Sequence, residues 1–124
     1  MSDKFLVMTE KTIKFKSFAF ALRIVKLFQF LTERKKEYVL SKQLLRSGTA
    51  IGALAREAEH SESKADFIHK IAIAQKEANE AEYWIELLFR SEYIDENVYQ
   101  SVILDAQEIQ KIISSIIITS KRNR

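Results

Sequence analysis

The chain has 124 residues with no proline and only two glycines, Gly48 and Gly52, so it has almost no local means of breaking a helix. Its apolar residues recur at spacings of three and four, which is the period of an amphipathic helix. The two glycines lie one helical turn apart, where each costs roughly 1 kcal/mol relative to alanine. Close approach of a neighbouring helix would offset that cost. We therefore predict an all-α protein in which this segment packs tightly.

Length and composition indicate one globular domain over residues 1–124. With 47% apolar and 30% charged residues, the chain is too hydrophobic for a disordered protein and too charged for a membrane bundle. No apolar run approaches the roughly 18 residues that a membrane span needs. The start, Met1-Ser2-Asp3-Lys4, lacks the apolar core of a signal peptide. We expect a soluble, cytoplasmic protein without a membrane partner.

Periodicity and capping residues predict four helices, at about 17–36, 39–60, 63–91 and 95–120. Ser17 is a candidate cap for the first helix and Asp95 for the fourth, while Ser63 and Asp66 have capping-box-like spacing at the third. The predicted loops are so short that consecutive helices must run in opposite directions. The expected architecture is an antiparallel up-down-up-down four-helix bundle, with loose residues before Ser17 and after Lys121.

The predicted first helix carries two apolar stripes, whereas a bundle helix normally needs one stripe of about 100°. The first stripe consists of Phe18, Leu22, Val25 and Phe28. The second consists of Phe20, Ile24, Leu27 and Leu31. Two stripes predict that this helix is covered from two directions, and we infer a contact between subunits of a homo-oligomer.

The third and fourth helices each have a single seam with alternating steps of four and three residues. The seam of the third helix is Phe67, Ile71, Ala74, Ala78, Ala81, Ile85 and Leu88. The seam of the fourth is Tyr99, Val102, Ala106, Ile109, Ile113 and Ile116. These residues are the expected contribution of both helices to the core.

The net charge of +3 conceals a separation of charge along the chain. Residues 1–56 carry twelve basic and four acidic side chains, whereas residues 57–108 carry four basic and thirteen acidic ones. The first two helices are therefore basic, and the third helix and the start of the fourth are acidic. Two interpretations remain open. The basic side chains could neutralise nucleic-acid phosphates, or they could pair with acidic helices of the same or a neighbouring subunit.

The candidate nucleic-acid-binding residues lie on the two basic helices. Lys42, Arg46 and Arg56 share one face of the second helix, and Arg23 and Lys26 lie on the first. The first hypothesis is a non-enzymatic oligomer that contacts RNA or DNA phosphates through these stripes without reading sequence. The alternative is a protein-interaction scaffold in which the basic surface serves assembly.

Catalytic and metal-binding patterns are nearly absent. Glu57 and His60, and likewise Asp66 and His69, have the carboxylate-histidine spacing of di-iron bundles, but these pairs flank one corner turn rather than facing each other at mid-bundle. Without cysteine there is no disulfide, thiolate metal site or cysteine nucleophile. No nucleophile turn or phosphate loop accompanies the serines and histidines. We expect no enzyme activity, no cofactor and no metal.

Residues 38–59, YVLSKQLLRSGTAIGALAREAE, resemble the signature of a known bacterial family, as do residues 63–89 and 91–94. It is the four-helix-bundle family of proteins encoded in intervening sequences of large-subunit ribosomal RNA genes. The resemblance covers about residues 18–94, and the last helix matches by pattern only. The residues that carry it are Gln43, Leu44, Arg46, Ser47, Ile51, Glu57, Phe67 and the run from Glu80 to Trp84. Many relatives have Asn-Ile where this chain has Ala53-Leu54, so any polar role of that asparagine is lost.

The resemblance implies a homopentameric barrel of bundles. The family is also similar to the accessory protein of diversity-generating retroelements, a basic pentamer that associates with a reverse transcriptase and nucleic acid. It therefore implies a fold, a pentameric assembly, and RNA or a reverse transcriptase as partners, without catalysis.

Overall fold

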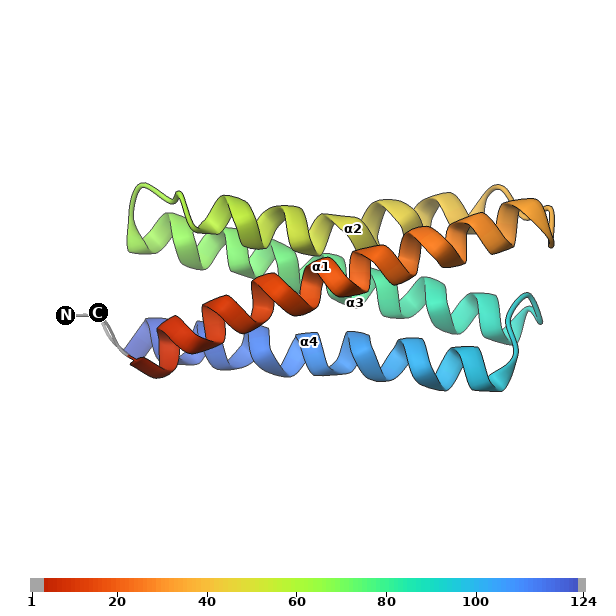
Figure 1. The fold of residues 1–124 in the computed structure, drawn as a ribbon. Helices are drawn as coiled ribbons and strands as arrows, with labels where there is room; N and C mark the ends of the chain where they lie inside the picture. The colour runs from red at the N-terminus through yellow and green to blue at the C-terminus, as the bar shows by residue number, and fades with distance from the viewer. Residues whose placement is uncertain (1–3, 123–124) are drawn as a thin grey trace.

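The computed structural model describes residues 4–122, which form four α-helices and, within that range, no strand. The helices are α1 (Lys4–Glu33), α2 (Leu40–Ala58), α3 (Lys64–Arg90) and α4 (Glu96–Arg122). Consecutive helices run in opposite directions, and α1 also packs against α4, which closes the four-helix bundle (Figure 1). The α1–α2 and α3–α4 loops lie at one end of the bundle, and the α2–α3 loop lies at the other end with the start of α1 and the end of α4.

The predicted ranges of α2, α3 and α4 agree with the observed ones to within two residues at each end. Two of the proposed caps account for that agreement. The Ser63 side chain accepts a hydrogen bond from the Asp66 backbone N–H at 3.0 Å, and the Asp95 carboxylate accepts one from the Val98 N–H at 2.8 Å. Each bond satisfies a backbone donor that the first turn of a helix leaves without a partner.

The predicted start of the first helix at Ser17 is wrong, because α1 begins thirteen residues earlier, at Lys4. Ser17 is buried within the helix, and its hydroxyl donates to the Lys14 carbonyl at 3.3 Å instead of capping a helix end. The added turns also have an apolar contact, since Ile13 is buried in the core. Residues 4–16 are therefore helical, not loose. Residues 1–3 and 123–124 lie outside the described part of the chain.

The tight packing predicted at the glycines is strongest at Gly48, which is buried against α1. A Cβ atom added at Gly48 would lie 2.9 Å from Ile24 Cγ1, closer than real Cβ contacts. A Cβ atom at Gly52 would meet its nearest neighbour, the Ser17 carbonyl oxygen, at 3.4 Å, which is ordinary van der Waals contact. The close approach of α1 and α2 therefore requires glycine at residue 48 but not at residue 52.

The loop between α3 and α4 contains a left-handed residue that is not glycine. Glu92 has φ 67°, its N–H donates to the Phe89 carbonyl, and the Tyr93 N–H donates to the Leu88 carbonyl, both at 2.9 Å. This pair of bonds is the Schellman ending of a helix, in which the left-handed position is usually glycine. Lys36 in the α1–α2 loop has φ 56° and is the second such residue among those described.

The two apolar stripes predicted on the first helix have different environments. We call the buried stripe, Phe20, Ile24, Leu27 and Leu31, the inner face of α1; it lies in the core with the predicted seams of α3 and α4. The other stripe remains at the surface of the single chain. Leu22 is 52% exposed, Phe18 and Val25 are also exposed, and Phe28 is half-buried. Phe15 extends this stripe and is 75% exposed. We call Phe15, Phe18, Leu22 and Val25 the outer face of α1.

Candidate nucleic-acid interface

Several basic side chains of α1 pair with acidic side chains of the neighbouring helices. Arg23 Nη1 lies 2.6 Å from Asp105 Oδ2, and its other terminal nitrogen donates to the Ser101 hydroxyl at 3.0 Å. Lys16 Nζ lies 3.0 Å from Glu108 Oε1, and thus also reaches α4. Because Arg23 already has these partners, it is not a free cation at the surface, although we singled it out as a phosphate contact.

Arg46 is held by α3. Its guanidinium lies 3.2 Å from the Glu77 carboxylate and also forms an ion pair with Glu80, which in turn accepts a hydrogen bond from Trp84 Nε1 at 3.0 Å. The hydrogen bond from Trp84 and the one from Arg46 hold the pKa of Glu80 below its ordinary value. Glu80 and Glu77 raise the pKa of Arg46, so this residue stays charged and bound between α2 and α3.

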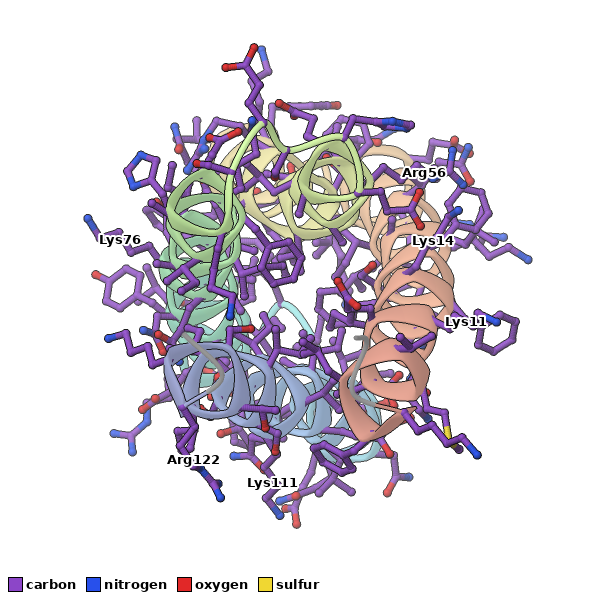
Figure 2. The ribbon with its side chains drawn as sticks, turned by 90° about the vertical axis from the view of Figure 1, so that its left-hand side faces the viewer. Lys11, Lys14, Arg56, Lys76, Lys111 and Arg122 are labelled. Atoms are coloured by element: carbon purple, nitrogen blue, oxygen red, sulfur yellow. The ribbon has the colours of Figure 1, made fainter. Side chains whose placement is uncertain are left out.

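Arg56 lies at the other end of α2, over the ring of Phe18 at 5.0 Å from its centroid. Figure 2 shows Arg56 on the same side of the bundle as Lys11 and Lys14, all three pointing outward. Lys14 Nζ is 3.1 Å from the Glu59 carboxylate. These four charged residues border a groove of about 570 Å³ whose apolar lining comes from the outer face of α1. Arg56 is thus associated with an apolar groove, not with a continuous basic stripe along α2.

Lys26 and Lys42 are exposed, and no ion pair involves them within residues 4–122. Lys26 lies about two turns before the end of α1, and Lys42 lies in the first turn of α2. The loop between these helices supplies three more exposed cations, Arg34, Lys35 and Lys36. None of these three forms an ion pair in the same range either. We call these five residues the basic corner. Of the five residues predicted for nucleic-acid contact, two therefore belong to the basic corner, two are held by neighbouring helices, and one stacks on Phe18.

The acidic residue in this loop is turned away from the surface. Glu37 is buried, and its carboxylate accepts backbone hydrogen bonds from Val39, Leu40 and Ser41 at 3.1, 2.9 and 2.6 Å. Burial raises the pKa of this carboxyl, but the backbone donors outweigh burial and place the pKa below its ordinary value. The negative charge of Glu37 therefore caps the positive end of α2 and is directed away from the loop cations, whose nearest exposed carboxylate in the sequence is Glu33.

Sequence reasoning missed the three cations of the loop. It searched for stripes on helix faces, whereas Arg34, Lys35 and Lys36 follow the end of α1 at Glu33. The signal was nevertheless present, because these residues are the longest uninterrupted basic run in the chain. Arg34, the first residue of the run, also keeps helical spacing with Lys26, since its N–H donates to the Phe30 carbonyl at 2.9 Å.

Elsewhere in residues 4–122, no group of three or more histidine, cysteine, aspartate or glutamate side chains is arranged to hold a metal ion. His60 and His69, which had suggested di-iron spacing, are both exposed. None of the four helices, over the residues described, is long and apolar enough to cross a bilayer.

Comparisons with known proteins agree with this fold. The family model described as 23S rRNA-intervening sequence protein matches residues 10–115. A crystal structure of a protein of unknown function from the S23 ribosomal protein family of Bacteroides thetaiotaomicron is similar, with 56% identity and a TM-score of 0.87. The match covers 88% of this chain and 97% of that one. No curated protein matches the chain. The sequence resemblance is therefore confirmed, and the chain belongs to the family of 23S rRNA-intervening sequence proteins.

Proposed function

We propose that this chain is a non-enzymatic, oligomeric protein of the cytoplasm that binds RNA through its basic corner. The observation that carries the proposal is the local excess of positive charge. Lys26, Arg34, Lys35, Lys36 and Lys42 lie within seventeen residues and lack ion pairs in the described chain, while Glu37 faces inward. Such a surface attracts phosphates without reading base sequence.

The distribution of the other cations supports this choice of surface. Figure 2 shows Lys76 pointing outward from α3, and Lys111 and Arg122 pointing outward from α4 on another side of the bundle, so the three do not form one patch. Arg23 and Arg46 would have to leave their carboxylate partners to reach a phosphate. We therefore assign these two arginines to the bundle. Arg56, beside the outer face of α1, would contact RNA only if an oligomer left it accessible.

The choice of RNA over DNA draws on the names of similar proteins. The family is named for sequences that interrupt 23S rRNA, and the Bacteroides relative is assigned to a ribosomal protein family. Both names refer to the ribosome or its RNA, which makes a structured ribosomal RNA fragment the first ligand to test. Duplex DNA is the comparison ligand.

We also propose that the outer face of α1 is the contact between subunits of a homo-oligomer, for which the family resemblance suggests a pentamer. The exposed side chains of Phe15, Phe18, Leu22 and Val25 support this, because a continuous apolar strip on one helix gains free energy when a partner covers it. The groove beside it is lined mostly by apolar surface and bordered by charged residues, which is the composition of an interface with a polar rim.

The alternative is a protein-interaction scaffold, such as an accessory subunit of a reverse transcriptase. This alternative is favoured by the ion pairs that basic side chains form within the bundle. Their partners are acidic residues of the last two helices or of the turn after α2, and the basic residues are Lys14, Lys16, Arg23 and Arg46. In that case the outer face of α1 would receive a different protein, and the basic corner would have no nucleic-acid ligand.

Binding across a salt series separates the two candidates. The test variant replaces Lys26, Arg34 and Lys42 with glutamine, and the control replaces Lys76, Lys111 and Lys121, so both lose three positive charges. Each lost phosphate contact lowers the slope of log affinity against log salt by about 0.7 to 0.9. We expect the slope for the ribosomal RNA fragment to fall by roughly two in the test variant and to change little in the control. Equal slopes in the two variants would reject the basic corner, and absence of RNA binding at low salt would favour the scaffold.

A further inference from the structure

We propose that the basic corner binds unpaired nucleotides, and that Phe30 and Tyr38 stack on their bases while the surrounding cations hold the phosphates. The inference rests on the proposed function and adds a substrate class to it, the single-stranded loops of a folded RNA. Neither aromatic residue was among the candidates found from the sequence.

Phe30 lies in the last turn of α1, is 41% exposed and has three cations and one exposed carboxylate, Glu33, near it. Lys26 and Arg34 are four residues before and after it, so they lie on the same side of the helix. Lys35 Nζ lies 5.9 Å from the centroid of the Phe30 ring. The ring thus sits on a surface with three positive charges close to it.

Tyr38 lies in the loop two residues after Lys36 and is 57% exposed. The residue between them, Glu37, directs its carboxylate to the backbone of α2, so no acidic side chain from this loop covers the phenol ring. The next residue, Val39, is exposed as well. The loop therefore presents a second ring beside cations without burying it in the bundle.

The charged surroundings of these rings favour a nucleic acid over an apolar protein surface. Covering Phe30 with apolar side chains would remove water from Lys26, Arg34 and Lys35 without giving them a partner, which is unfavourable. A nucleotide supplies an aromatic base for the ring and a phosphate for the cations. The outer face of α1 differs, because Leu22 and Val25 join its two phenylalanines in one apolar strip.

The requirement for unpaired nucleotides follows from stacking. In a duplex, each base has its two faces covered by its neighbours, so a surface ring cannot reach them. In a loop or single strand, bases can turn outward and stack on aromatic side chains. The rings should therefore distinguish single-stranded from duplex RNA, whereas the cations alone bind both.

The test compares the wild type with the double variant Phe30→Leu and Tyr38→Leu, which keeps apolar volume and every charge but removes both aromatic rings. The matched control is Tyr83→Leu, because Tyr83 is 59% exposed on α3 beside the acidic residues Glu82 and Glu86. The probes are a twelve-nucleotide uridine RNA, a backbone of the same length lacking its bases, and a twelve-base-pair RNA duplex. Native mass is recorded for each protein.

We expect the wild type to bind the uridine RNA more tightly than the abasic backbone. The double variant should lose roughly thirtyfold or more in affinity for the uridine RNA, the effect of two stacked bases, with less than a twofold change for the abasic backbone and the duplex. Tyr83→Leu should bind all three probes like the wild type. This pattern would establish base stacking at the corner.

Other patterns overturn the inference in distinguishable ways. If the double variant binds the uridine RNA as tightly as the wild type does, base stacking is wrong, while salt-dependent binding of all probes would leave the proposed RNA function intact. If the wild type binds no probe at low salt, the proposed function fails and the inference fails with it. If the double variant changes native mass, Phe30 and Tyr38 belong to a contact between subunits and not to an RNA site.

Discussion

The inner and outer faces of α1 consist of the same kinds of residue, yet only the inner face is covered within the chain. Ile24 on the inner face is fully buried, whereas Leu22, two positions earlier on the outer face, is 52% exposed. The core cluster includes the inner face and the seams of α3 and α4, except that Phe67 and Tyr99 are only partly buried and pack against it. The outer face borders a groove open to solvent. Apolar periodicity therefore identifies faces that need a partner, but it does not say whether the same chain supplies one.

The comparison predicts that a substitution will affect folding on the inner face and association on the outer face. The expected change in the free energy of unfolding is largest on the inner face and smallest on the outer face. Each substitution is made on the full chain.

The largest effect is expected for Ile24→Ala, which removes a fully buried side chain at the contact with Gly48. Such truncations cost about 2 to 5 kcal/mol, because they remove apolar contacts and leave a cavity. Leu22→Ala on the outer face is the matched control and should change the stability of the monomer by no more than about 0.5 kcal/mol. Urea unfolding of both variants measures the difference. Equal losses, at a protein concentration where both are monomeric, would contradict the division of α1 into two faces.

The next effect separates the two glycines that face α1. In Gly48→Ala the new methyl group would meet Ile24 Cγ1 at 2.9 Å, so we expect a net loss of about 1 to 2 kcal/mol after the gain in helix propensity. In Gly52→Ala the methyl group fits, and the variant should be more stable than the wild type by up to about 1 kcal/mol. Thermal unfolding gives both signs directly, and a stabilised Gly48→Ala variant would show that α1 and α2 are not in tight contact.

Low pH should reduce the free energy of unfolding through Glu37, in the loop that follows the inner face of α1. The Glu37 N–H donates to the carbonyl of Leu31 at 2.9 Å, and the Glu37 carboxylate caps α2. Since the pKa of Glu37 is lowered on folding, its contribution to stability is present above the ordinary glutamate pKa of 4.5 and is lost as the pH falls through the folded value. We expect Glu37→Gln to cost about 1 kcal/mol at pH 7. The difference in free energy of unfolding between the variant and the wild type should disappear below pH 4.5. A difference that stays constant down to pH 2 would exclude this role of Glu37.

The smallest change in unfolding free energy is expected on the outer face, for the double variant Phe18→Gln and Leu22→Gln. Both side chains are exposed in the single chain, so each substitution should cost within about 0.5 kcal/mol in the monomer. Native mass should nevertheless fall to that of the monomer, because polar side chains would replace the centre of the proposed contact between subunits. A double variant with the native mass of the wild type would place the subunit contact elsewhere or leave the outer face to another protein.

Much of the fold could be predicted because its local signals are unambiguous. Ser63 and Asp95 immediately precede the third and fourth helices, and their side chains do accept backbone hydrogen bonds there. Ser17 misled the same reasoning, because a serine inside a helix can donate to a preceding carbonyl, as it does to Lys14. Capping residues therefore mark helix starts reliably only where apolar periodicity also stops.

The candidate site could be predicted less well, because it depends on distances between helices. The charge separation correctly indicated basic and acidic helices, but the choice of Asp105 and Ser101 as partners of Arg23 depends on the register of α1 against α4. Apolar periodicity fixes which face is inside and leaves that register open. Consequently, the sequence could not tell Arg46, which is bound to α3, from Lys42, which is free on the same helix.

The left-handed backbone of Lys36 creates a conflict between folding and binding at a single residue. A residue with a Cβ atom at φ 56° costs about 1 to 2 kcal/mol that glycine avoids. Lys36→Gly would therefore increase the free energy of unfolding but remove a cation from the basic corner. Glu92→Gly would increase the free energy of unfolding without removing a cation. Selection for stability alone would favour glycine at both residue 36 and residue 92. If related sequences kept lysine at residue 36 but had glycine at residue 92, the basic corner would be a surface maintained for its ligand.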